Sequence, residues 1–101
     1  MNEVEQEESR AAQAAGEIAS VLQATRHMCE VWSSLSSEER TEMARDWARE
    51  LPRHTGRGAQ YILGFLDQRP DLRAAWDRLD AQEQESRVKI FTAILRKYGY
   101  E

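Results

Sequence analysis

The side chains able to carry nucleophilic or metal chemistry are few in this chain of 101 residues. It contains one cysteine, Cys29, and two histidines, His27 and His54. Nucleophilic catalysis needs a Ser or Cys beside an oriented base, and neither histidine stands in a recognisable nucleophile motif. His27 and Cys29 cannot complete a zinc site without further ligands, and the chain has no second cysteine. We therefore expect no catalytic residue, metal site or cofactor, and we interpret Cys29 as a small core residue.

The segment Thr55-Gly56-Arg57-Gly58 resembles a phosphate-binding loop in one respect. It precedes an expected helix, and free N–H groups at a helix N-terminus attract anions. A P-loop also needs a preceding strand, which is not predicted here, and a Lys-Ser/Thr pair, which is missing. Ordinary loop and cap chemistry is the better interpretation of this segment.

A local cluster of basic side chains is the expected partner contact, because arginine forms bidentate pairs with carboxylate or phosphate groups. Its members are Arg45, Arg49, Arg53, His54 and Arg57. Two classes of protein stay open at this point. A small dimeric helical DNA-binding regulator would use the cluster against phosphates. A protein–protein interaction module, either an adaptor or a small inhibitor that docks on a larger protein, would use it against carboxylates.

The surrounding sequence favours the protein partner. The loop from Pro52 to Gly58 is longer than the turn of about 3–4 residues in a helix-turn-helix. The helix that would read bases offers chiefly Gln60 outside an apolar run. We therefore predict a non-enzymatic interaction module, with nucleic acid as the disfavoured alternative partner.

Charge and composition point the same way. The net charge is −4, and four glutamates near the N-terminus account for all of it: Glu3, Glu5, Glu7 and Glu8. The rest of the chain is neutral and attracts phosphate weakly. We expect residues 1–9 to form an acidic, frayed tail and residues 10–101 to form a single helical domain.

The same composition indicates the compartment and source. The mean hydropathy is −0.76, and no apolar run approaches the ~20 residues that cross a bilayer. A lone cysteine allows no internal disulfide, so we expect a reducing, cytoplasmic setting and no membrane partner. Arginines outnumber lysines by 12 to 2, which indicates a GC-rich bacterial genome. Small, acidic helical proteins without catalytic motifs are also common among phage products, so a phage origin is the other expectation.

The elements that must position the basic cluster are helices, and two of their starts resemble each other. Trp32-x-x-Leu35-Ser36-x-x-Glu39 recurs 44 residues later as Trp76-x-x-Leu79-Asp80-x-x-Glu83. Each copy predicts the end of one helix, a tight turn and a capping box that starts the next. Two copies are too few to establish a repeat, so duplication and coincidence both stay open.

The apolar stripes predict an all-α fold, a compact bundle of about five helices. The recurrence of the Trp-x-x-Leu-Ser/Asp-x-x-Glu pattern favours two related helical hairpins around a central apolar helix. The helices are expected near 9–34, 37–51, 58–68, 70–79 and 81–98.

The first predicted helix is long for so small a domain. At 1.5 Å per residue it would run about 38 Å, so it must break, wrap round the rest, or project and pair. Gly16 is its weakest point. We expect a two-fold homodimer, with packing inside the chain's own bundle as the competing outcome. The self-association residues would be Ala11, Ala15, Ile18 and Leu22.

The third helix is apolar on nearly every side, which is typical of the middle of a bundle or of an interface. Gly64 would allow close packing there. The expected core contains Ile18, Leu22, Met28, Trp32, Leu35, Met43, Trp47, Leu51, Ile62, Leu63, Leu66, Leu72, Trp76, Leu79, Val88, Phe91 and Leu95.

Overall fold

The computed structural model describes the backbone of residues 3–101 and the side chains from residue 6 onward. Over that range the chain forms six α-helices and one 3₁₀ turn, and no strand. These are α1 (Glu3–Ala24), α2 (Met28–Ser34), α3 (Ser37–Glu50), η1 (Leu51–His54), α4 (Gly58–Leu66), α5 (Pro70–Asp77) and α6 (Ala81–Lys97). The predicted all-α bundle is confirmed. Of the predicted tail, residues 1–2 lie outside the described residues, and α1 begins at Glu3.

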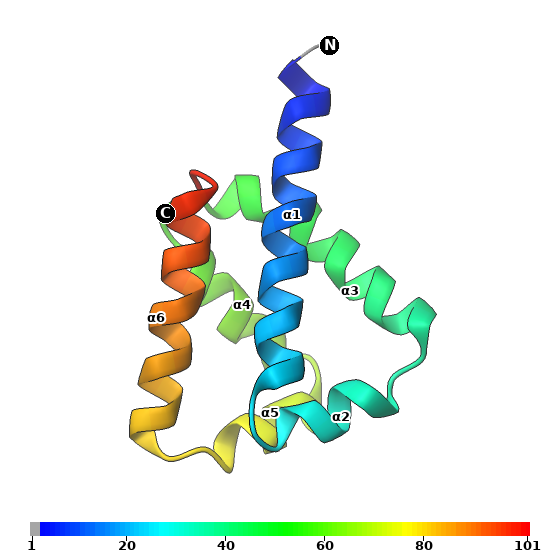
Figure 1. Ribbon diagram of the computed structural model, residues 1–101, viewed down its shortest axis with the longest axis vertical. Coiled ribbons are helices and arrows are strands. Elements are labelled where there is room, and N and C mark those ends of the chain that lie inside the picture. Colours follow the sequence, from blue (N-terminus) through cyan, green and yellow to red (C-terminus); the bar gives the residue numbers. More distant parts are fainter. Residues whose placement is uncertain (1–2) are drawn as a thin grey trace.

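The prediction of one helix over residues 9–34 is wrong, because the chain turns between α1 and α2 (Figure 1). Thr25 is buried at this turn, and its hydroxyl donates a hydrogen bond to the carbonyl of Val21 over 2.6 Å. The same hydroxyl accepts a hydrogen bond from Nε of Arg87 in α6 over 3.1 Å. His27 then adopts φ 68, in the left-handed region that non-glycine residues rarely occupy. The break therefore lies where α6 contacts the chain, and Gly16 stays within α1.

Both predicted capping boxes are present. The Ser36 hydroxyl accepts a hydrogen bond from the N–H of Glu39, and the Glu39 carboxylate accepts one from the N–H of Ser36. Asp80 and Glu83 make the same reciprocal pair at the start of α6. These boxes satisfy N–H groups that the first turn of a helix leaves without partners.

The two hairpins, α2–α3 and α5–α6, also match in their aromatic packing. The rings of Trp32 and Trp47 stack with centroids 6.1 Å apart and planes 22° apart. The rings of Trp76 and Phe91, which occupy the aligned positions, stack at 6.4 Å and 24°. Trp47 also meets Phe65 of α4 edge to face at 5.5 Å. The sequence echo thus corresponds to a shared local geometry.

The centre of the bundle holds α1 and not the predicted apolar helix. The alanine-rich α1 packs against α2, α3 and α6 (Figure 1). In α4 only Gly58, Ile62 and Leu66 are buried, and Gly64 lies exposed with open space beside it. Small side chains on α1 let its three neighbours approach its axis closely, whereas α4 packs mainly against α6, η1 and α5.

Most of the predicted core is buried. Leu63 and Val88 are the exceptions, since both are only half-buried. The core also includes residues outside the prediction, among them Ala14, Ala75 and Tyr100.

The molecule measures 43 × 29 × 20 Å, and the N-terminal end of α1 rises beyond the other elements (Figure 1). Further down, Glu17 of α1 accepts hydrogen bonds from Lys97, at 3.1 Å, and from the hydroxyl of Tyr98. None of the described helices is both long and apolar enough to span a bilayer.

Candidate functional site

Three consecutive elements carry most of the predicted basic cluster: the C-terminal half of α3, the η1 turn and the loop into α4. Pro52 has no N–H to donate, so α3 ends at Glu50 and the chain tightens into η1. Gly56, at φ 87, then turns the chain, and its N–H donates to the carbonyl oxygen of Tyr100 over 3.1 Å. The loop is thereby attached to the C-terminal end of the chain.

An aromatic pair lies beside the cations of this loop. The rings of His54 and Tyr61 stack at 4.7 Å with their planes 11° apart. Burial raises the pKa of Tyr61, and the carboxylates of Glu50 and Asp46 raise it further, so its hydroxyl stays protonated and can donate. We name the surface formed by these side chains the η1 corner: Arg49, Arg53, His54, Arg57 and Tyr61.

The positive charge of the η1 corner is partly balanced from within. Arg49 pairs with Asp46 at 2.7 Å and with Glu50 at 3.6 Å. Glu50 also lies 3.9 Å from Arg53 and 3.8 Å from Nε2 of His54. The side chains of Arg49 and Arg53 are nevertheless 62% and 71% exposed, so solvent weakens these pairs and a partner can compete for the arginines.

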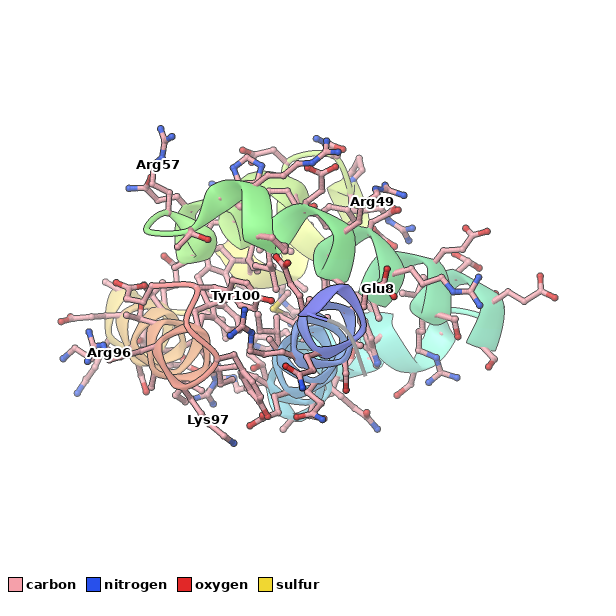
Figure 2. The ribbon with its side chains drawn as sticks, turned by 90° about the horizontal axis from the view of Figure 1, so that it is seen from above. Glu8, Arg49, Arg57, Arg96, Lys97 and Tyr100 are labelled. Carbon is pink, nitrogen blue, oxygen red and sulfur yellow. The ribbon has the colours of Figure 1, made fainter. Side chains whose placement is uncertain are left out.

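Arg57 differs from the other arginines of the η1 corner. It is exposed, and its guanidinium makes no ion pair with any side chain that the structure describes. Figure 2 shows it pointing away from the body of the molecule. Its charge and its hydrogen-bond donors are therefore free for a partner.

Arg45 is not part of the η1 corner. It lines a separate open depression of about 310 Å³ together with Ser37, Glu38, Thr41 and Glu42. The carboxylates lie on the same side of α3 because residues three to four apart share a helical face. Of the five predicted residues, Arg49, Arg53 and His54 are thus connected through Glu50, Arg57 points into solvent, and Arg45 lines another depression.

A groove runs between the first turns of α1 and the end of α3 with η1, and we name it the α1/η1 groove. It encloses about 320 Å³. Its floor is formed by small apolar residues, and its walls are charged. The lining residues are Glu7, Glu8, Ala11, Ala48, Arg49, Pro52 and Arg53.

The four predicted self-association residues all contribute to the chain's own core. Ala11, Ala15, Ile18 and Leu22 are each at most 2% exposed. In this fold only the edge of Ala11, in the α1/η1 groove, lies near the surface. Self-association itself stays a prediction, and of these four side chains only Ala11 lies at a surface that a second copy could contact.

The remaining candidates from the sequence are His27, Cys29 and the loop before α4. Nε2 of His27 accepts a hydrogen bond from Arg26 over 3.0 Å, and Cys29 is a half-buried free thiol. In the described part of the chain, no three His, Cys, Asp or Glu side chains lie close enough to hold a metal ion. Gly58, in the predicted phosphate-like loop, is buried against Leu95.

Sequence reasoning missed Tyr100, which is 2% exposed and lies between α6 and α1 (Figure 2). The guanidinium of Arg10 lies 5.4 Å from the centroid of the Tyr100 ring. The N–H of Tyr100 donates to the carbonyl of Leu95 over 2.7 Å, and the N–H of Gly99 donates to the carbonyl of Arg96. This is a Schellman motif, in which the residue after the terminal glycine commonly makes an apolar contact with the last turn. An aromatic residue directly after Gly99 was the available signal.

Comparison of the chain with family models, with curated proteins and with solved structures finds no match of any of the three kinds.

Proposed function

We propose that this protein is a non-enzymatic protein–protein interaction module, an adaptor or a small inhibitor that docks on a larger protein through the η1 corner. The observation that carries the proposal is the exposed arginines beside the stacked rings of His54 and Tyr61. Arginine and tyrosine are the residue types that most often dominate the energetics of protein interfaces. Arg57 supplies a charge that no described side chain neutralises.

The expected partner is a protein surface that presents carboxylates. A guanidinium can take a carboxylate in two parallel hydrogen bonds, and the aromatic pair offers a flat apolar surface next to it. Asp46 and Glu50 stand among the arginines and would repel the closely spaced phosphates of a nucleic acid. Nucleic-acid binding is therefore the alternative outcome of the test.

We also propose that the module works as a homodimer in a reducing, cytoplasmic compartment of a bacterial or phage-infected cell. The lone cysteine and the excess of arginine over lysine support this setting. The charged groove beside the η1 corner supports the dimer.

The test is affinity capture from lysate, followed by reconstitution with the purified captured protein. The informative variant is Arg53→Glu with Arg57→Glu, which reverses two exposed charges of the η1 corner. Its matched control is Arg78→Glu with Lys89→Glu, which makes the same charge change at exposed positions on the α5–α6 hairpin. We expect the wild type and the control to retain one defined protein, and the η1-corner variant to lose it.

Two results would contradict the proposal. Equal binding by the η1-corner variant would show that the η1 corner is only a solvated surface. Salt-sensitive retention of the wild type on DNA, without a protein partner, would favour the regulator.

A further inference from the structure

The α1/η1 groove lies at the end of the molecule where α1 projects. Figure 1 shows the first turns of α1 rising beyond the neighbouring elements at this end. Viewed from that end in Figure 2, Glu8 on α1 and Arg49 on α3 lie on neighbouring elements, with Arg57, Arg96 and Lys97 also around the same end. The projecting end of α1 thus carries acidic side chains, whereas several side chains on the other elements at this end are basic.

The two walls of the α1/η1 groove carry opposite charges that do not meet. Glu7 and Glu8 stand on the α1 side, and Arg49 and Arg53 stand on the other. Among the described side chains no ion pair joins the two walls, although all four residues line one groove. Arg49 pairs instead with Asp46 and Glu50, and Arg53 pairs with Glu50. These pairs are largely exposed, so a carboxylate of a partner can compete for both arginines.

The floor of the groove suits a helix. Ala11, Ala48 and Pro52 are short side chains, which let another backbone approach closely. A surface with small apolar residues between opposite charges is complementary to a second surface of the same kind, turned through half a revolution.

From these observations we propose that the α1/η1 groove is a self-association surface, occupied by the first turns of α1 from a second copy in a two-fold dimer. A two-fold interface uses the same patch on both copies, so Glu7 and Glu8 of each copy would face Arg49 and Arg53 of the other. Glu7 and Glu8, which make no ion pair among the described side chains, would then each lie close to an arginine of the other copy. This inference deepens the proposed function, on which it rests, by assigning one occupant to the side of the η1 corner that faces α1.

The test uses two charge-reversed variants of the full chain. In one, Glu7→Arg and Glu8→Arg make both walls positive. In the other, Arg49→Glu and Arg53→Glu make both walls negative. Light scattering after size-exclusion chromatography should give twice the 11.7 kDa chain mass for the wild type and a single chain mass for each variant alone. An equimolar mixture of the two variants should restore the dimer, because every contact between unlike copies again joins opposite charges.

Controls separate this surface from general charge and folding effects. Reversing the exposed pair Glu85 and Lys89 on α6 should leave the dimer unchanged. Circular dichroism reports whether each variant folds. If a reversed variant does not fold, the milder Glu7→Gln with Glu8→Gln should raise the dimer dissociation constant about tenfold.

Several results would overturn the inference. They are a wild type that stays at 11.7 kDa from micromolar to millimolar concentration, a dimer that survives both reversals, and a mixture that stays monomeric. Its failure can be told from failure of the proposed function, since Glu7→Arg with Glu8→Arg leaves every η1-corner residue intact. Retained partner binding by this variant as a monomer would leave the proposed function standing alone.

Discussion

Replacing Gly16 and Gly58 with alanine should change the free energy of unfolding in opposite directions. Gly16 lies exposed within α1, and a Cβ there would meet open space. Gly16→Ala should therefore stabilise the protein by about 0.5–1 kcal/mol, because glycine loses more backbone freedom in a helix. A Cβ at Gly58 would lie 2.6 Å from a methyl carbon of the buried Leu95, so Gly58→Ala should cost about 1–3 kcal/mol. Urea denaturation measures both changes, and effects of the same sign would contradict this packing.

Tyr100 separates the value of an aromatic ring from that of its hydroxyl. The ring is buried, whereas the hydroxyl is buried without a hydrogen-bond partner among the described residues. Tyr100→Phe should leave the free energy of unfolding unchanged or raise it by up to ~1 kcal/mol, since an unsatisfied polar group is removed. Tyr100→Ala should lower it by about 3 kcal/mol. A large loss in the Phe variant would mean that the hydroxyl has a partner, such as a buried water.

Spacing along the chain predicted which residues would share a surface only where they follow one another closely. Arg49 and Arg53 are one helical turn apart in the sequence and both lie next to Glu50, whereas Arg57 points away from the body of the molecule. Arg45 fits the same spacing but lines another depression. The contact between His54 and Tyr61 depends on how the loop returns, and that path is fixed by Tyr100 through Gly56. No local pattern encodes it.

At the scale of elements, the helix starts could be predicted and the break in the first helix could not. A capping box is a contact between residues three apart, so Ser36 and Glu39 carry its full signal. The turn after α1 depends instead on Thr25 meeting Arg87, which lies 62 residues later in the sequence. The hydroxyl of Thr25 also donates to the carbonyl of Val21 in the preceding turn, a bond that threonine commonly makes within helices and that does not by itself predict a break.

The contact between α1 and α6 makes stability depend on pH. The hydrogen bond from Tyr98, and then the one from Lys97, lower the pKa of Glu17. A carboxyl group whose pKa is lowered by folding stabilises the folded protein at pH values above its ordinary pKa. This stabilisation is lost as the pH falls through the lowered pKa. The melting temperature of the wild type should therefore exceed that of Glu17→Gln near pH 7, and the difference should shrink below about pH 4. A difference that stays constant with pH would show that the Glu17 carboxylate contributes no charge-dependent stability.

For the whole molecule, the uneven distribution of charge follows from the sequence and the fold taken together. The sequence places the excess negative charge at the start of α1. Only the fold shows that this end of α1 stands beside Arg49 and Arg53. Ions screen exposed charges over about 8–10 Å at physiological salt, so a dimer built on these contacts should weaken as salt is added. Sedimentation equilibrium measures this, and a dimer that strengthens with salt would indicate an apolar interface instead.

Amide hydrogen exchange can show whether the η1 corner binds another protein. Exchange would be compared in this chain alone and in its complex with the captured partner. We predict slower exchange over residues 49–61, which carry the η1 corner, and little change over residues 78–89, which span the α5–α6 turn and the first half of α6. Protection confined to residues 78–89, with none over 49–61, would place the partner on another face and contradict the claim.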